Sequence, residues 1–526
     1  MPTWGCPKGH PEATWTSPFR DTLAPPYHQL GYDVMIAATL LRFALDLPER
    51  KVLALLEDGW GVPLAQSTLS RLTTEGLVRW QMLVEERLPR LTGELAPLLL
   101  QIDGTVTPGA PVTFRARHAL TGATLWAMQL EVESRPEVVR FLRAFQARYG
   151  NPLLVLRDLS PTLREAVAEV FPGVPQQEDH FHFLADLGPL ILVDYEPLRK
   201  GLLAGEGLAH LAQWSRKLPM EGRTLEELER VWVRLALEWV EEGRLHPGGF
   251  PFRCAYAEVV RRLERVAGWA REILRANLRL YVGVAEVREL KERAERLLGR
   301  EGVRVPWSRL QAEIALWEEI RREMRAERDR RGREDLAPLA SADVMAAREA
   351  IEVAGSRFAS LGDWAEAIWG RVSGQFEAHG PYLWVEAPGL GVVVRSTVAL
   401  ERAHREDRRG VRHRRGSGST GEEMGHLGTL LAYWSNVRCP WFVKKVLSEL
   451  NLWEEYARQN AKEVQRRMTS LPREGRRPKV DVPRRKKEGK LAELVALLQN
   501  PGPLGPGLSA WAASVGSLTS QAGLDA

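Results

Sequence analysis

Leu98-Leu99-Leu100-Gln101-Ile102-Asp103 is the stretch that decides the fold of this 526-residue chain. A short apolar run of this kind is typical of a buried strand, and this one ends in an acid. Leu153-Leu154-Val155-Leu156-Arg157-Asp158 repeats the pattern, and Ser160-Pro161 then offers a helix N-cap followed by a proline at the first helical position. We therefore predict two buried strands, each with an aspartate at its carboxyl end.

The elements around these two strands give the fold class. Alternation of apolar and polar residues, with a Thr121-Gly122 turn, predicts a hairpin, and apolar residues at three-to-four spacing predict helices. Three further strands cover residues 112–118, 124–132 and 174–179, and two helices cover residues 136–150 and 161–170. This order is expected of an α/β ribonuclease H-like core with a mixed five-stranded sheet. The first and fourth strands of such a sheet are neighbours, so Asp103 and Asp158 should lie side by side.

A helical region precedes this core. The pattern from Tyr32 to Leu91 predicts three helices, with a break at Gly59-Trp60-Gly61-Val62-Pro63 before the third. This layout is that of a helix-turn-helix, in which the first polar residues of the last helix face a DNA groove. Those residues are Gln66, Ser67 and Arg71. The alternative is a plain helical hairpin.

Basic residues gather in two blocks, although the net charge is only +5. Residues 401–415 contain seven arginines against three acids, and residues 473–490 contain nine lysines or arginines against three acids. Two such blocks favour a phosphate-bearing partner, and the alternative for each is a solvated face or a disordered tail. The predicted DNA contacts are Arg405, Arg408, Arg412, Arg414 and Arg415 in the first block, and Arg484, Arg485, Lys486 and Lys487 in the second.

Composition argues against several classes of protein. The three cysteines are too few for a disulfide framework, which suits a reducing cytoplasm. No run of 18 apolar residues occurs, so the sequence predicts no membrane span. Hydrophobic and charged fractions of 44% and 27% are those of ordinary globular domains.

Two neighbouring aspartates repel one another unless a cation lies between them. A site for two divalent ions needs that arrangement together with a third carboxylate, and such a site stabilises the attacking and leaving oxygens of a phosphoryl displacement. The third acid should come from a helix that packs across the same sheet.

The residues at these positions resemble a known family. The core stretches are Ile102-Asp103-Gly104-Thr105, Leu156-Arg157-Asp158-Leu159-Ser160-Pro161 and Asp179-His180-Phe181-His182. The later stretches are Ser396-Thr397-Val398-Ala399-Leu400-Glu401 and Arg414-Arg415-Gly416-Ser417-Gly418. Over roughly residues 30–455 the chain resembles bacterial insertion-sequence transposases of the DDE class, of the Mutator-like and related types that carry a long insertion before the third acid.

The resemblance implies an activity and a site. Asp103, Asp158 and Glu401 would hold two Mg²⁺ ions, which Mn²⁺ can replace, and water and then a 3′-hydroxyl would act as nucleophiles. The partners would be DNA, both element ends and target, and further copies of this chain assembled on that DNA. The location would be the cytoplasm, in association with the nucleoid. The arginines after Glu401 would run along phosphates, where guanidinium groups suit bidentate contact.

The sequence also predicts six segments. They are an irregular segment at 1–30, a helix-turn-helix region at 31–96, the two parts of the core at 97–189 and 386–456, an all-helical insertion at 190–385 and a basic, partly disordered tail at 457–526.

Some alternatives stay open at this stage. Thr420-Gly421-Glu422-Glu423 offers another acid, but Thr-x-x-Glu is also a capping box that explains Glu423 without catalysis. His180 and His182 either line the site or pack at the strand end. The function could instead be that of an inactive, transposase-derived DNA-binding protein or of a structure-selective nuclease on the same fold.

Overall fold

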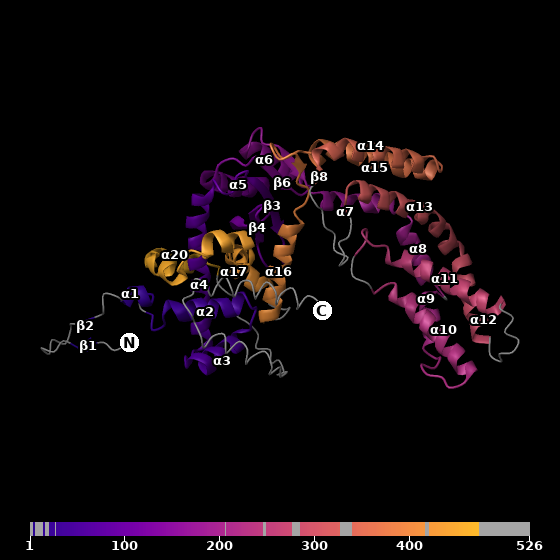
Figure 1. The fold of residues 1–526 in the computed structure, drawn as a ribbon, viewed down its shortest axis with the longest axis horizontal. Helices are drawn as coiled ribbons and strands as arrows, with labels where there is room; N and C mark the ends of the chain where they lie inside the picture. The colour runs from indigo at the N-terminus through magenta and orange to yellow at the C-terminus, as the bar shows by residue number, and fades with distance from the viewer. Residues whose placement is uncertain are drawn as a thin grey trace. The chain divides into compact units, whose positions relative to one another are not determined.

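The computed structural model describes residues 4–5, 14–15, 20–26, 28–205, 207–245, 249–275, 285–326, 339–415 and 420–472. The chain divides into two compact units (Figure 1). The first takes in residues 1–177, 387–389 and 396–526, and the second takes in residues 178–386 and 390–395. None of the described helices combines the length and the hydropathy that a membrane crossing requires.

The first unit begins with a helical region. Its short elements are β1 (Trp4–Gly5), β2 (Thr14–Trp15), α1 (Arg20–Leu23) and η1 (Leu88–Leu91), and its main helices are α2 (Tyr32–Phe43), α3 (Glu49–Trp60) and α4 (Gln66–Arg87). Gly61 ends α3 at a φ of 66°, a left-handed conformation that favours glycine. The three helices predicted between Tyr32 and Leu91 are confirmed, as is the start of the third at Gln66. Residues 72–80 of α4 are buried, so this helix also forms the centre of the unit's core.

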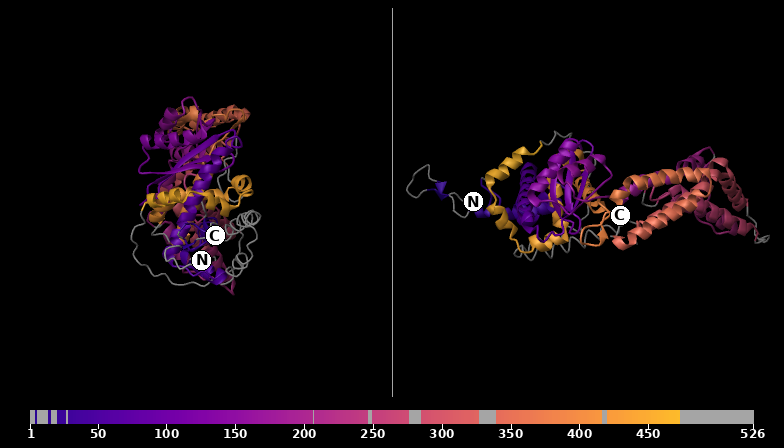
Figure 2. Two further views of the ribbon diagram at one scale, coloured as in Figure 1. Left: turned by 90° about the vertical axis from the view of Figure 1, so that its left-hand side faces the viewer. Right: turned by 90° about the horizontal axis from the view of Figure 1, so that it is seen from above.

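A mixed five-stranded sheet follows, drawn in purple in Figures 1 and 2. Its strands are β3 (Leu99–Thr105), β4 (Val112–His118), β5 (Thr124–Leu130), β6 (Leu154–Arg157) and β7 (Gln176–Glu178). They lie in the order β5-β4-β3-β6-β7, with β3 antiparallel to β4 and parallel to β6. All five predicted strands are confirmed, and so is the pairing of the first strand with the fourth.

Helices cover both faces of this sheet. Successive side chains of a strand point to opposite faces, so neighbouring residues of one strand contact different helices. Phe114 of β4 packs against Phe141 of α5 (Arg135–Tyr149), with ring centroids 5.0 Å apart. The next side chain along, Arg115, pairs with Asp407 on the other face. Helix α6 (Pro161–Val170) packs beside α5 and begins as predicted, with the Ser160 hydroxyl accepting the Leu163 N–H.

The C-terminal elements complete the first unit. They are α16 (Val398–Arg415), α17 (Thr420–Trp434), η3 (Ser435–Arg438), α18 (Pro440–Phe442), the π-helical turn η4 (Val443–Leu447), α19 (Leu452–Arg458) and α20 (Ala461–Ser470). Trp434 packs edge-on against Trp80 of α4 at 5.1 Å, and the Trp80 indole N–H donates to the Tyr433 carbonyl. The end of α19 and all of α20 fall within the predicted tail, so the first residues of that segment are helical.

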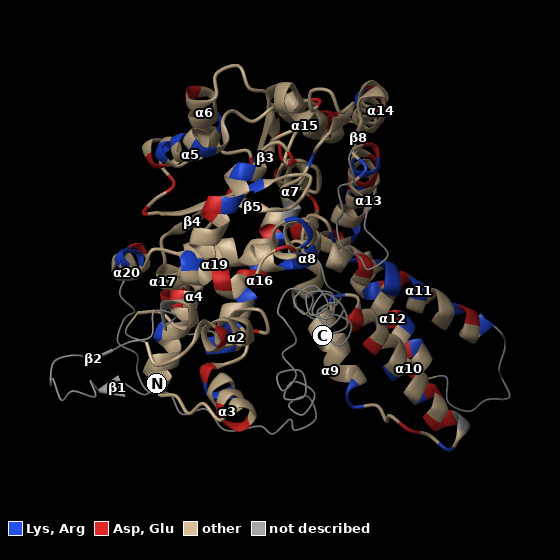
Figure 3. Ribbon diagram, turned by 60° about the vertical axis from the view of Figure 1, so that its left-hand side comes forward, with Lys and Arg blue, Asp and Glu red and all other residues tan. Residues whose placement is uncertain are grey.

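The second unit is almost all helical, as predicted. Its helices are α7 (His180–Ile191), α8 (Tyr195–Leu203), α9 (Leu208–Ser215), α10 (Leu225–Glu242), α11 (Ala255–Arg275), α12 (Ala285–Gly299), α13 (Glu301–Glu323), α14 (Ser341–Ala359) and α15 (Asp363–Leu383). Strands β8 (Leu339–Ala340) and β9 (Val392–Val393) pair antiparallel. Figure 3 shows acidic and basic residues interspersed along α10, α11 and α12. Pairs such as Arg234–Glu238 and Arg293–Glu289 at i,i+4 spacing stabilise these exposed surfaces.

One buried acid makes the stability of this unit depend on pH. Glu313 of α13 is fully buried and its Oε2 accepts the Asp194 N–H at 3.1 Å. Burial, followed by the negative charge of Asp194, raises the pKa of Glu313 to about 8, although the hydrogen bond from the Asp194 N–H and, less strongly, the charge of Arg309 act to lower it. The folded chain therefore holds a proton that the unfolded chain releases near pH 4.5, so the free energy of unfolding should fall as pH rises from about 4.5 to 8.

We expect Glu313→Gln to remove most of this decrease, because glutamine keeps the acceptor without the charge. Each pKa unit corresponds to about 1.4 kcal/mol, so the effect should reach a few kcal/mol at pH 8. Urea unfolding of the full chain and of the variant at pH 5 and pH 8 measures it. Parallel pH profiles for the two proteins would contradict this assignment.

Candidate active site

Asp103 and Asp158 lie near the carboxyl ends of two adjacent strands, although β3 runs two residues beyond the predicted end at Asp103, to Thr105. Asp103 belongs to β3, and Asp158 directly follows β6. The parallel register pairs Leu99 with Leu154 and Gln101 with Leu156. Asp103 and Asp158 are each two residues beyond the last of these pairs, so the same register places them opposite one another.

The backbone turn after β6 holds the Asp158 carboxylate. Its Oδ1 accepts the Ser160 N–H at 2.9 Å, so the same loop that starts α6 also orients the acid. Glu133, in the loop between β5 and α5, lies close enough for its pKa to be raised by burial and then by the charge of Asp158. The sequence analysis missed Glu133, because it stands in a loop without periodicity or motif.

Helix α16 brings Glu401 to the strand that carries Asp103. The helix packs against β3, and the Gln101 side-chain amide donates to the Ser396 carbonyl at 2.8 Å just before the helix begins. His404 Nε2 lies 3.9 Å from Asp103 Oδ2. Residues three apart share a helix face, so Glu401 is one turn from this contact, and its side chain is half-buried.

His404 is a second residue that the sequence analysis missed. Its side chain is 2% exposed. Burial, then the charges of Arg115, Arg408 and Arg117, lower its pKa well below 6.5, although the Asp103 backbone opposes them. The ring is therefore neutral at physiological pH. Its position three residues after Glu401 is the only sequence signal that could have identified it.

The three predicted metal ligands do not converge as a closed metal centre. Within the described part of the chain, no three histidines, cysteines, aspartates or glutamates come together as a metal ion requires. The structure brings Asp103 and Asp158 to neighbouring strand ends and Glu401 to the helix over β3.

The arginines of α16 divide into two sets. Arg405 and Arg412 are exposed, as are Arg402 and Arg409, and Arg408 is half-buried. Spacing of three, four and three residues puts Arg402, Arg405, Arg409 and Arg412 on one face of the helix. These four residues, here called the arginine stripe, form an outward-facing row of positive charge.

Arg414 and Arg415 correct the sequence analysis, which assigns them to DNA. Their side chains are only 4% and 6% exposed. Both bind the carboxylate of Glu423 in α17, and Arg414 also binds Asp46 in the loop between α2 and α3. These two guanidinium groups hold the helices of the first unit together.

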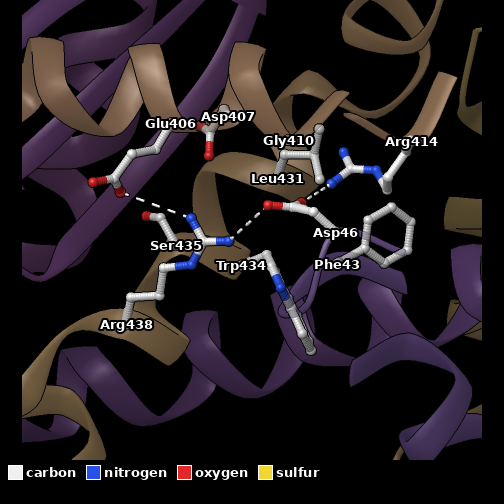
Figure 4. A pocket seen from close by; sticks show the side chains of 10 residues that line it. All are labelled: Phe43, Asp46, Glu406, Asp407, Gly410, Arg414, Leu431, Trp434, Ser435 and Arg438. Atoms are coloured by element: carbon white, nitrogen blue, oxygen red, sulfur yellow. Dashed lines mark hydrogen bonds and ion pairs between the residues drawn. The ribbon is translucent and has the colours of Figure 1, made fainter. Parts of the chain in front are cut away.

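Figure 4 shows the surroundings of Asp46 in a small pocket. Asp46 lies between Arg414 and Arg438, and Arg438 also reaches Glu406 at 3.7 Å. A Cβ atom on Gly410 would come within 2.4 Å of the Asp46 carboxylate, so α16 needs a glycine here for this close approach.

Glu423 has a structural role different from the predicted cap. Its side chain is 1% exposed and lies between Arg414 and Arg415. Burial acts to raise its pKa, but Arg414, Arg415 and Arg42 together lower it below the ordinary value, so the carboxylate is ionised. This internal ion network explains Glu423 without catalysis.

The remaining predicted residues have other surroundings. Gln66, Ser67 and Arg71 are exposed at the start of α4, where the Gln66 amide donates to Glu49 Oε2 at 2.6 Å. His180 is fully buried in the second unit, and its ring contacts the Leu383 carbonyl and Trp384; the His182 ring is partly exposed, 3.7 Å from Asp179. Arg484, Arg485, Lys486 and Lys487 fall outside the described residues.

No family model matches this chain, and no curated protein matches it in sequence.

Proposed function

We propose that the chain is a DNA transposase that cleaves DNA and joins the freed 3′-hydroxyl to a target strand. The observation that carries the proposal is the position of Asp103 and Asp158 at the carboxyl ends of the adjacent parallel strands β3 and β6. The strand order β5-β4-β3-β6-β7, with one antiparallel hairpin, supports a ribonuclease H-like core. The second unit, between Asp158 and Glu401 in sequence, is the helical insertion of this proposal.

The donor set suits magnesium. Asp103, Asp158 and Glu401 would supply only carboxylate oxygens, the ligands that Mg²⁺ prefers. Two bound ions would supply an activated nucleophile and neutralise charge on the reacting phosphate. Asp103 and Asp158 fit this role by their register, and Glu401 fits by its place on α16.

Other residues would bind and orient DNA. The arginine stripe lies on the same helix as Glu401 and would hold phosphates beside the acids. Gln66, Ser67 and Arg71, exposed at the start of α4, would read the element ends as a helix-turn-helix does.

A strand-transfer assay tests the proposal. Oligonucleotides taken from the DNA that flanks the gene are incubated with the purified chain, Mg²⁺ and a plasmid target. We expect cleavage at the end of the flanking repeat, followed by joining of its 3′-hydroxyl to the plasmid. Cleavage without joining would favour a nuclease, and binding without either step would favour an inactive DNA-binding protein.

Neutralising the arginine stripe should weaken DNA binding regardless of sequence. We expect the combined variant Arg402→Gln, Arg405→Gln, Arg409→Gln and Arg412→Gln to flatten the plot of log binding constant against log salt. For each arginine that no longer neutralises a phosphate, the slope should change by roughly 0.9. Fluorescence anisotropy of labelled DNA measures the slope. The salt concentration is varied between about 50 and 200 mM, a range over which the affinity of such electrostatic binding falls steeply.

A charge-matched control uses exposed arginines of η1 and α5 that already pair with glutamates. These are Arg90, Arg135, Arg140 and Arg143. Their replacement by glutamine should leave the slope close to that of the unmodified chain. Equal slopes for both quadruple variants would show that α16 does not contact phosphates.

A further inference from the structure

A buried arginine lies on the strand next to β3, directly opposite Asp103, the first aspartate of the proposed site. Arg115 of β4 pairs in register with Asp103 of β3, so the two side chains emerge on the same face. This is the face that α16 covers. The Arg115 side chain is 0% exposed, and its Nη2 binds the Asp407 carboxylate of α16.

The other two nitrogen atoms of the Arg115 guanidinium do not share in this ion pair. Its Nε and Nη1 atoms are buried and make no hydrogen bond to any residue that the structure describes. Burying an arginine with a single carboxylate partner is costly. An apolar residue at this place in the core would serve packing alone, so the charge has another role.

Asp407 stands on the face of α16 that meets the sheet. His404, which contacts Asp103, is one turn before it, and Glu401 is one further turn back. Leu400 and Val411 of this helix are apolar and fully buried, and Arg414 and Arg415 pair with Glu423 where the helix ends. Apolar contacts do not fix the rotation of a helix about its axis, whereas directional ion pairs do. Of these pairs, the one made by Asp407 lies closer in sequence to Glu401 than those made by Arg414 and Arg415.

We propose that the Arg115–Asp407 ion pair is a positioning element that fixes the rotation of α16, and thereby aims Glu401 at Asp103 and Asp158. The inference rests on the proposed function, because it assigns Glu401 to the same site as the two aspartates. Neither partner touches DNA or a metal ion in this account. Arg115 and Asp407 act through the helix, and His404 lies between them and Glu401 as part of the aimed face.

The test compares Asp407→Asn with a variant that weakens the same helix without changing the ion pair. Val411→Ala removes a buried apolar contact of α16 and serves as this matched control. Both variants are assayed for DNA cleavage over a range of Mg²⁺ concentrations, at a temperature where circular dichroism shows each to be folded. We expect Asp407→Asn to raise the half-saturating Mg²⁺ concentration at least tenfold, and Val411→Ala to leave it within twofold.

Rescue by a conservative change separates positioning from packing. Asp407→Glu restores the charge one methylene further from the backbone, and it should recover most of the Mg²⁺ response. An unchanged Mg²⁺ response in Asp407→Asn, or an equal shift in Val411→Ala, would overturn the proposal.

Titration with Mn²⁺, followed by electron paramagnetic resonance, distinguishes failure of this inference from failure of the proposed function. A chain that binds Mn²⁺ without cleaving DNA would contradict the function, and the same variants would still report on positioning through Mn²⁺ affinity. A chain that neither binds Mn²⁺ nor cleaves DNA would contradict both.

Discussion

Replacing Asp103 by asparagine is expected to reduce Mg²⁺-dependent DNA cleavage by roughly a thousandfold or more. Loss of a metal ligand removes several kcal/mol of transition-state stabilisation, and about 1.4 kcal/mol corresponds to a factor of ten in rate. Asp158→Asn and Glu401→Gln should have effects of the same order, because the three carboxylates act as one unit. Single-turnover cleavage of a labelled oligonucleotide measures each rate.

The same variants should fold and bind DNA nearly as the unmodified chain does. Asparagine and glutamine keep the size of the side chain, so the substitutions leave no cavity. Glu165→Gln is the control, because this exposed carboxylate of α6 pairs with Arg135 and belongs to neither strand end nor α16. It should retain cleavage. Cleavage that survives Asp103→Asn would refute the transposase mechanism.

Glu423→Gln should lower the free energy of unfolding by about 3–5 kcal/mol, the cost of breaking a buried ion pair. This exceeds the roughly 0.5–2 kcal/mol for loss of a helix cap. The larger effect follows because the change leaves Arg414 and Arg415 buried without the carboxylate that both of them bind. Urea unfolding at pH 7 measures it.

The neighbouring Glu422 provides the control for this change. It is exposed, and Glu422→Gln should alter stability by no more than about 0.5 kcal/mol. A loss of only a few tenths of a kcal/mol in Glu423→Gln would contradict the buried network. Loss of cleavage in folded Glu423→Gln, with cleavage retained in Glu401→Gln, would instead make Glu423 the third acid.

The sheet could be predicted because its signals are local. Apolar runs such as 153–156 and the alternation of 112–118 mark strands without reference to the rest of the chain. Pairing of the first strand with the fourth followed from the order of elements, and the neighbouring positions of Asp103 and Asp158 followed from that pairing. The N-cap at Ser160 was likewise visible in the sequence.

Which of the α16 arginines are buried and which are exposed depends on the elements that pack against this helix. Leu400, Ala403 and Val411 mark the buried face of this helix, and helical spacing from Leu400 puts Arg414 on the same face. That much was accessible from the sequence. The sequence explains Glu423, the nearby partner of Arg414 and Arg415, as part of a capping box. Their distant partners Asp46 and Glu49 were not accessible, because these lie more than 350 positions away and no local pattern pairs them.

His404 and Arg115 were missed for a related reason. A lone histidine within an arginine-rich helix carries no signal of burial, and an arginine in a strand with alternating residues suggests an exposed face. Both become recognisable only when α16 is placed over β3 and β4.

Mn²⁺ binding by the full chain, measured by isothermal titration calorimetry, tests most directly whether the acids of β3, β6 and α16 form one metal centre. The account predicts binding to the unmodified chain and to Glu423→Gln below its unfolding temperature. It also predicts that Asp103→Asn, Asp158→Asn and Glu401→Gln each weaken binding at least about tenfold, a change of roughly 1.4 kcal/mol. Binding that is unchanged in Glu401→Gln, or absent from the unmodified chain, would contradict it.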